Sequence, residues 1–291
     1  MAEPVAAAAP TLGQALAWGR ERIPALEARL LLAHACGSPV SFLLAYPERP
    51  LPEHAWRTFT ELVTRRVAGE PVAYLTGTRE FYGRSFQVTP DVLIPRPETE
   101  TLIDVALALA DQRPGPLRIL DLGTGSGCVA ITLALELPQA EVVAVDCSTA
   151  ALAVARRNAM SLGANIALIE SDWFYQLGDE VFDLIVANPP YLAPDDPHLQ
   201  EGDLRFEPRQ ALVAEWNGLR ELVAITLYAP DFLAQGGWLL LEHGWTQAKE
   251  VRGMLLDVGL FDVQTWRDLG NRDRVSGGRK RWMWDWTHTG T

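Results

Sequence analysis

The chain has 291 residues, of which 48% are hydrophobic, and its formal net charge at pH 7 is -12. This length and this hydrophobic content supply a substantial core for one large domain or two unequal ones, and they exclude a largely disordered chain. The negative charge argues against non-specific binding to long nucleic acid, because such binding depends on neutralising phosphates.

The three cysteines, Cys36, Cys128 and Cys147, form no disulfide framework, which fits a reducing cytoplasm. We expect Cys128 and Cys147 to be small buried residues. No cationic region precedes an apolar run at the N-terminus, so a typical signal peptide is not expected. No run of about 18 apolar residues is present, so a membrane span is not expected either.

The first 70 residues predict a small helical bundle, after an Ala/Pro-rich start over residues 1–10 that we expect to be frayed. Thr11 is a typical helix cap, and the helical spacing of apolar residues predicts further helices over residues 24–35, 41–46 and 53–68. The side chains expected to face inward are Leu12, Leu16, Trp18, Leu26, Leu30, Leu31, Trp56, Phe59, Leu62, Val63 and Val67. His34 and His54 are isolated, so no metal site is expected, and a bundle without chemistry of its own is most simply a substrate-docking domain.

Residues 71–97 are expected to link the two domains. Within them, residues 81–88 predict a β-hairpin that turns around Gly83 to Ser85. The prolines of residues 94–97 hold the following segment extended, and a helix is expected to begin at Glu98 or Thr99. An ordinary proline linker is an equally good interpretation of this composition.

A glycine-rich turn follows the next predicted strand, which covers residues 117–122. The turn reads Gly123-Thr124-Gly125-Ser126-Gly127 and leads into a predicted helix over residues 129–135. Glycines let the backbone turn sharply and let a ligand approach the main chain closely. Asp146 ends the following strand about twenty residues later, where a carboxylate can accept both ribose hydroxyls of an adenosine. These features still permit either NAD or S-adenosylmethionine.

The next strand, residues 166–169, leads to Asp172 and Trp173, an acid and an aromatic that suit an adenine; a buried core Trp is the alternative. The strand over residues 181–187 then ends in Asn188-Pro189-Pro190-Tyr191. Prolines cannot donate to a sheet ladder, so the strand must stop there and place Asn188 at the sheet edge where ligands bind. The bland alternative is a turn that merely closes the strand.

This tetrapeptide suits a planar nitrogen. An amide oxygen and a neighbouring carbonyl can each accept one N–H of a substrate NH₂ group, and a tyrosine ring can pack on its flat face. A nicotinamide enzyme needs a proton donor or acceptor near the hydride site, and no obvious His or Lys is available for that task. The pattern therefore favours S-adenosylmethionine over NAD.

The rest of the chain completes an α/β sheet. Residues 192–212 form a long polar loop of a kind that is often functional. Helices are expected over residues 219–228 and 247–256, and strands over residues 238–241 and 262–266. Residues 274–284 are expected to supply a last, antiparallel edge strand, although Gly277 and Gly278 weaken that prediction. Glu242 and His243 end the fifth strand, and we interpret them as structural.

Taken together, the motifs resemble those of class I S-adenosylmethionine-dependent methyltransferases that act on planar nitrogens. Residues 71–77, 94–100, 206–208 and 241–244 narrow the resemblance to the release factor glutamine methyltransferases, the HemK-like family, over residues 11–279. The Ala-rich start and the Trp-rich end (Trp282, Trp284, Trp286) depart from that pattern. The resemblance implies a Rossmann-like seven-stranded methyltransferase domain over residues 98–291, preceded by the helical domain (1–70) and the hairpin linker (71–97).

The resemblance also implies roles for individual residues and partners. Gly123 to Gly127 would line the methionine and ribose end of S-adenosylmethionine, Asp146 would hold the ribose and Trp173 would flank the adenine. Asn188 would touch cofactor and substrate, and Asn188, Pro189, Pro190 and Tyr191 would clasp the substrate amide. The implied reaction methylates the Gly-Gly-Gln glutamine of class I peptide chain release factors in the cytoplasm, yields S-adenosylhomocysteine and uses no metal.

Two alternatives remain at this stage. An adenine-N6 nucleic-acid methyltransferase uses the same pocket for an exocyclic amine, but it needs a basic surface and often base flipping, against which the charge of -12 argues. A non-catalytic scaffold that binds S-adenosylmethionine would not need an intact motif over residues 188–191.

Overall fold

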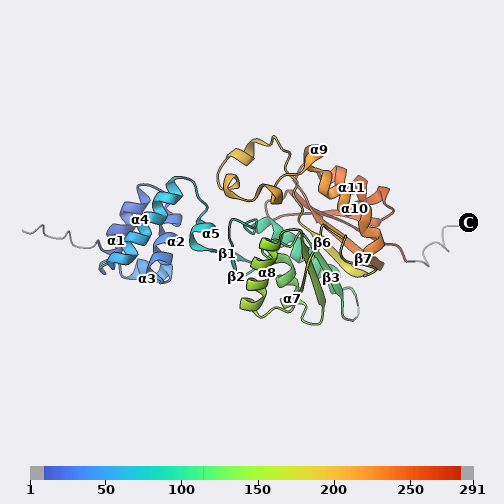
Figure 1. Ribbon diagram of the computed structural model, residues 1–291, viewed down its shortest axis with the longest axis horizontal. Helices are drawn as coiled ribbons and strands as arrows, with labels where there is room; N and C mark the ends of the chain where they lie inside the picture. Colours follow the sequence, from blue (N-terminus) through green and yellow to red (C-terminus); the bar gives the residue numbers. More distant parts are fainter. Residues whose placement is uncertain (1–9, 114, 283–291) are drawn as a thin grey trace, which may run out of the picture. The chain divides into compact units, whose positions relative to one another are not determined.

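The computed structural model of the protein describes residues 10–113 and 115–282. These residues form two compact units (Figure 1): one lies within Met1–Thr78 and Gln200–Phe206, the other within Arg79–Leu199 and Glu207–Thr291. Of the expectations above, the frayed start (except Pro10) and the positions of Trp284 and Trp286 fall outside the described residues. Among those described, no helix is both long enough and apolar enough to cross a bilayer.

The N-terminal unit is helical. Its helices are α1 (Leu12–Arg20), α2 (Ala25–Cys36), α3 (Val40–Ala45), α4 (Glu53–Val67) and α5 (Val72–Thr76). A reciprocal cap starts α1: Gln14 N donates to Thr11 Oγ1 at 3.3 Å, and Thr11 N donates to Gln14 Oε1 at 2.8 Å. Leu16, Leu31, Leu32 and Phe59 are among the side chains that fill the core of this unit.

Three of the apolar residues expected inside this unit are exposed, so those predictions are wrong. Leu26 is 64% exposed, Leu30 is 40% exposed and Val67 is 61% exposed. Helix α2 carries leucines on several sides, so its sequence offers more than one apolar stripe. The stripe of Ala28, Leu31 and Leu32 is the one that the neighbouring helices bury.

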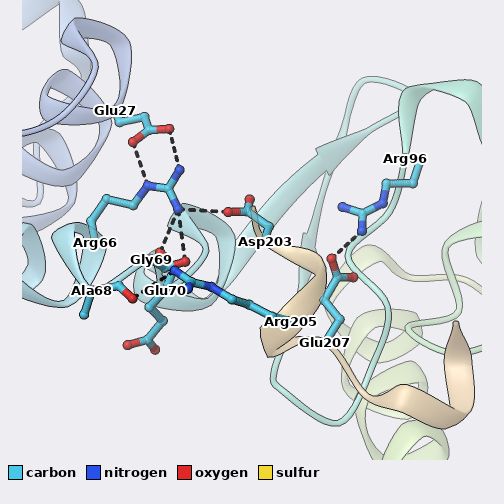
Figure 2. A network of polar contacts seen from close by, with 9 residues as sticks. All are labelled: Glu27, Arg66, Ala68, Gly69, Glu70, Arg96, Asp203, Arg205 and Glu207. Atoms are coloured by element: carbon cyan, nitrogen blue, oxygen red, sulfur yellow. Dashed lines mark hydrogen bonds and ion pairs between the residues drawn. The ribbon is translucent and has the colours of Figure 1, made fainter. Parts of the chain in front are cut away.

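A segment distant in sequence completes the N-terminal unit (Figure 2). The guanidinium of Arg66 binds both carboxylate oxygens of Glu27, at 2.7 and 2.9 Å, and also binds Asp203 Oδ1 at 2.8 Å. Arg205 donates to the carbonyl of Ala68 at 3.1 Å. The central part of the long loop that follows residues 188–191 therefore belongs to the helical unit.

Glu207, which lies two residues after Arg205 in this loop, is anchored in the second unit (Figure 2). The side chain of Glu207 pairs with Arg96. It also accepts a hydrogen bond from Ile94 N at 3.0 Å. Its side chain is completely buried. The 206–208 motif thus supplies a buried carboxylate that satisfies donors of the proline-rich segment around residues 94–96.

We predict that Arg66→Ala destabilises the N-terminal unit by about 2 kcal/mol, because it leaves two partly buried carboxylates without their partner. The matched control is Arg57→Ala on the same helix, whose pair with Glu53 is exposed on both sides and contributes less than about 0.5 kcal/mol. Amide hydrogen exchange of α4 measures both changes. Equal protection in the two variants would contradict the prediction.

The second unit is built on a seven-stranded sheet with the order β5-β4-β3-β6-β7-β9-β8. The strands are β3 (Arg118–Leu122), β4 (Glu141–Asp146), β5 (Ala167–Glu170), β6 (Phe182–Ala187), β7 (Leu233–Glu242), β8 (Phe261–Arg267) and β9 (Asp273–Arg279). The first five strands of this order are parallel, and β9 is antiparallel to both of its neighbours. The predicted α/β fold class is confirmed.

Helices cover both faces of this sheet (Figure 1). They are α6 (Glu100–Ala110), α7 (Cys128–Glu136), α8 (Thr149–Leu162), α9 (Glu215–Gly218), α10 (Arg220–Phe232) and α11 (Ala248–Asp257). Successive strand residues point to opposite faces, so Ile119 packs in the core under α6 and α7, while Leu120 packs in the core under α10 and α11. The apolar runs of the central strands reflect this double burial.

A two-stranded hairpin, β1 (Thr78–Phe81) and β2 (Arg84–Gln87), lies in the predicted linker and turns at Tyr82 and Gly83. The long loop after β6 is not featureless: it contains the short 3₁₀ turns η2 (Pro197–Gln200), η3 (Leu204–Phe206) and η4 (Arg209–Ala211), and a further such turn, η1 (Pro97–Thr99), precedes α6.

The last strand is not at the sheet edge, which corrects the prediction. Strand β9 lies between β7 and β8, so β8 is the edge strand. The two glycines that weakened the prediction are what fit β9 into the interior. A Cβ on Gly277 would lie 2.5 Å from Leu240 Cδ2, and a Cβ on Gly278 would lie 3.0 Å from Leu260 Cβ.

Candidate active site

The register of the sheet brings the predicted site residues to one level. Leu122 of β3 lies opposite Val145 of β4 and Ala187 of β6, and Ala187 lies opposite Leu241 of β7. The residues that follow directly are the predicted site residues Gly123, Asp146 and Asn188, together with Glu242, which was interpreted as structural. The carboxyl ends of parallel strands are where open α/β sheets bind ligands.

A cavity of about 300 Å³ opens at this edge, which matches the lower end of the range for small-molecule sites. The predicted site residues that line it are Gly123, Thr124, Gly125, Ser126, Asp146, Trp173, Asn188 and Pro190. Gly127, Pro189 and Tyr191 are not among its described lining residues. Gly127 instead precedes α7 as its N-cap, with φ of +81°.

The buried carboxylate of Asp121 holds the glycine-rich turn. Asp121 Oδ2 accepts hydrogen bonds from Thr124 Oγ1 at 2.6 Å and from Ala130 N at 3.2 Å. Burial raises the pKa of Asp121 to about 7. Gly123 and Gly125 have φ of +71° and +56°, a region that side chains disfavour. The turn therefore depends on its glycines and on this internal acceptor.

Asp146 stands at the end of β4 and faces the same turn. Its oxygen Oδ2 accepts from Gly125 N at 2.8 Å, and Oδ1 accepts from Ser148 N at 2.9 Å. Burial raises its pKa, and these backbone bonds oppose that rise. The carboxylate is thus fixed in the cavity wall with lone pairs that suit a vicinal diol.

Trp173 forms another wall of the cavity. Its Nε1 donates to Glu221 Oε2 at 2.9 Å, which fixes the indole plane. A Cβ on Gly123 would lie 3.3 Å from Trp173 Cζ3, so the glycine lets the ring approach the turn closely. The indole is only partly buried, which leaves part of it free to stack on a flat ligand.

Asn188 and Tyr191 are oriented by partners from distant parts of the chain. Asn188 Nδ2 donates to Thr99 Oγ1 at 3.1 Å, and this bond does not use the lone pairs of Oδ1. The Tyr191 hydroxyl donates to Glu242 Oε1 at 3.3 Å, and the Tyr191 carbonyl accepts from Gln247 Nε2 at 3.1 Å. Burial raises the pKa of Tyr191, and the charge of Glu242 raises it further.

Glu242 holds the tyrosine end of the motif. It is fully buried and accepts a hydrogen bond from the Tyr191 hydroxyl through Oε1, whereas its buried Oε2 has no hydrogen-bond partner among the described residues. Burial raises its pKa from 4.5 to about 7. His243, also fully buried, lies between Gly244 O at 2.9 Å and Ser276 Oγ at 2.8 Å, and burial lowers its pKa. Glu242 thus contacts the motif, whereas His243 bonds to residues of the sheet and its following loop.

Each unit of the chain contains residues that match a known protein family. Residues 13–77 match the PrmC N-terminal domain family, and residues 105–201 match the Methyltransferase small domain family. A release factor glutamine methyltransferase of Bordetella pertussis is 51% identical over 260 residues, which are 88% of this chain and 95% of the relative. The enzyme of that name in Escherichia coli K12 is 45% identical over 271 residues, which are 90% and 97%.

The chain belongs to the release factor glutamine methyltransferase family. Solved structures with lower identity support the fold. A Pyrococcus furiosus methyltransferase is 18% identical with a TM-score of 0.52, covering 76% of this chain and 99% of its own. The RNA methyltransferase RsmC of Thermus thermophilus is 20% identical with a TM-score of 0.53, covering 70% and 50%.

Three residues contact Asn188 or Tyr191 although they were not predicted as site residues: Thr99, Gln247 and Glu242. Thr99 and Glu242 lie within the short motifs at residues 94–100 and 241–244, which was the available signal. Gln247 had no signal, since its role depends on contacts with residues far away in sequence. The expectation that Cys147 is buried is wrong: Cys147 is exposed and lines the cavity. Among the described residues, no group of three or more His, Cys, Asp or Glu side chains could hold a metal ion.

We predict that Asp146→Ala weakens the binding of S-adenosylhomocysteine by roughly ten-fold or more, because a charged acceptor in the cavity wall is lost. Isothermal titration calorimetry measures the change, and Asp179→Ala, an exposed residue of the same unit, is the control. Equal affinities for wild type and Asp146→Ala would contradict the assignment.

The raised pKa of Glu242 makes a prediction about stability and pH. The folded state holds this proton more tightly than the unfolded chain, so the stabilisation is complete below about pH 4.5 and is lost as the pH rises through about 7. Glu242→Gln keeps an acceptor for Tyr191 but cannot ionise. Its unfolding free energy should therefore gain on wild type between pH 5 and pH 8.

Urea unfolding of both proteins at the two pH values measures this gain, and Glu250→Gln, at an exposed position of α11, is the control. A difference between wild type and Glu242→Gln that does not change with pH would show that Glu242 is ionised in the folded protein throughout this range.

Proposed function

We propose that this chain transfers a methyl group from S-adenosylmethionine to the side-chain amide nitrogen of the glutamine in the Gly-Gly-Gln motif of class I peptide chain release factors. The observation that carries the proposal is Asn188-Pro189-Pro190-Tyr191 at the carboxyl edge of the sheet, with Asn188 and Pro190 in the cavity wall. The identities of 51% and 45% to relatives named release factor glutamine methyltransferase support a release factor as the substrate.

The cavity would hold the cofactor. The backbone of the turn from Gly123 to Gly127 would hold its methionine and ribose end, Asp146 would accept the ribose hydroxyls, and Trp173 would flank the adenine. The group that the cofactor supplies when bound is an electrophilic methyl on a sulfonium. Glu221 fixes the indole of Trp173, on which the adenine would stack.

Asn188 and Pro189 would hold the substrate amide. An amide nitrogen is a poor nucleophile, because its lone pair is delocalised into the carbonyl. The Asn188 oxygen and the Pro189 carbonyl would accept its two N–H bonds and stabilise the positive charge that develops on the nitrogen. The bond from Asn188 to Thr99 holds the side chain ready for this role, so that little reorganisation is needed at the moment of reaction.

Tyr191 would supply the flat surface of the amide site. Glu242 restrains the ring at its hydroxyl, and Gln247 restrains the backbone carbonyl of Tyr191. No strong general base is required, because the methylated nitrogen is acidic and can lose its proton to water. This chemistry agrees with the position of His243, which is fully buried and bonded to Ser276.

The helical domain of residues 1–70 would serve as the docking domain for the protein substrate. Residues 71–97 would be the linker, and residues 98–291 would be the methyltransferase domain. Leu26 and Leu30, one turn apart on α2, expose apolar surface that a protein partner can cover. The partner would be the release factor, and neither nucleic acid nor membrane is required.

An adenine-N6 methyltransferase is the alternative that the amide pocket by itself allows. The catalytic domain of human Mettl16, solved with an RNA hairpin, has a TM-score of 0.56 and 16% identity over 77% of this chain and 82% of its own, which is a likeness of fold only. The net charge of -12 and the names of the close relatives favour the protein substrate.

Methylation of purified release factor tests the proposal. We predict that the wild-type protein with S-adenosylmethionine adds one methyl group to the Gly-Gly-Gln peptide, and that Asn188→Ala lowers kcat by about 10²-fold or more. Intact-mass and peptide mass spectrometry measure the product. The exposed Asn165→Ala is the control, and retained binding of S-adenosylhomocysteine shows that Asn188→Ala is folded.

A DNA duplex that contains adenine is incubated in parallel. Methylated adenine with an unmodified release factor would favour the nucleic-acid enzyme, and no methylation of either substrate would remove the support for the proposed one.

A further inference from the structure

A strained turn lies directly beside the amide motif. In α9, Trp216 has φ of 54° and ψ of 49°, and Asn217 has φ of 56° and ψ of 38°. Gly218 follows with φ of +83°. Glycine and, to a lesser degree, Asn tolerate this left-handed region, whereas a bulky Trp is an outlier there. Such strain persists only where surrounding contacts hold it, and it is concentrated at functional sites.

The contacts that hold this turn are the same ones that hold Tyr191. Gln247 Nε2 donates to Asn217 O at 3.3 Å and to Tyr191 O at 3.1 Å, and Gln247 Oε1 accepts from Gly244 N at 2.9 Å. A Cβ on Gly218 would lie 2.0 Å from Tyr191 O, so only glycine fits against this carbonyl. The turn is therefore packed on the backbone of the amide motif.

A backbone bridge ties the turn to the motif a second time. Ala214 N donates to Leu192 O at 2.9 Å, and Leu192 N donates to Leu212 O at 3.0 Å. Leu192 is the residue directly after Tyr191, and Ala214 is the N-cap residue of α9. The position of Trp216 is thus fixed relative to the place where the substrate amide would lie.

The indole that this turn carries is exposed. Trp216 is 64% exposed, and Trp245, next to the Gly244 that Gln247 also holds, is 59% exposed. Tryptophan is highly buried on average, and exposed indoles at protein surfaces are typical anchors of binding interfaces. Trp216 and Trp245 are therefore neighbours of Asn217 and Gly244. The side chain of Gln247 binds the backbone of both of these residues and that of Tyr191.

We propose that Trp216 is a specificity-determining contact for the protein substrate, and that its indole packs on the polypeptide that flanks the target glutamine. An amide held at residues 188–191 remains attached to its own chain, which must leave the site over its surface. The two glycines before the glutamine carry no side chains, so their peptide planes can lie flat against an aromatic ring. Trp245 would extend this surface. The inference rests on the proposed function and deepens it.

Steady-state kinetics on intact release factor test the inference. Trp216→Ala is expected to raise KM for the factor about ten-fold or more, with kcat changed less than two-fold and with unchanged affinity for S-adenosylhomocysteine. Trp216→Gly should give the same result, because glycine removes the indole and suits the left-handed backbone. Trp216→Phe should recover part of the affinity. The matched control is Tyr228→Ala, an aromatic on α10 that is 55% exposed.

An unchanged KM in both Trp216→Ala and Trp216→Gly would overturn the inference. A fall in cofactor affinity, or a fall in kcat without a rise in KM, would also overturn it, since Trp216 would then act through the catalytic site. If wild type itself does not methylate the factor, the proposed function fails first, and that outcome is distinguished by the wild-type reaction alone.

Discussion

The register of the parallel strands is the constraint on which the candidate site depends. Because β3, β4, β6 and β7 run in the same direction and end at the same level, the residues that follow them meet at one edge. A glycine turn, a carboxylate and an amide are thus assembled from three separate strand ends. A slip of one residue would turn the side chains of a strand to the opposite face and disperse this arrangement.

Buried carboxyl groups then fix the loops that leave this edge. Asp121 holds the glycine turn through Thr124 and Ala130, and Glu242 holds the hydroxyl of Tyr191. Burial raises the pKa of both acids to about 7, so desolvation competes with the hydrogen bonds that they accept. These groups cost stability when ionised, and in return they orient polar atoms that would otherwise move freely.

The loop after the amide motif is shared between the two units. Its central segment, Gln200–Phe206, belongs to the helical unit through Asp203 and Arg205, whereas Glu207 belongs to the second unit. This loop is therefore held by contacts within each of the two units. The Arg66 network is the anchor on the helical side, and the buried Glu207 is the anchor on the other.

The sequence by itself determined the fold class, the order of the strands' motifs and the local chemistry, because glycines, prolines and apolar periodicity act on neighbouring residues. It predicted where β6 ends and that the residues after it suit a planar nitrogen. Only the tertiary structure decided which stripe of α2 is buried, that β9 lies inside the sheet, and that Thr99 meets Asn188 across 89 residues. These outcomes depend on which surfaces meet, and a local pattern carries no information about a partner that lies far away along the chain.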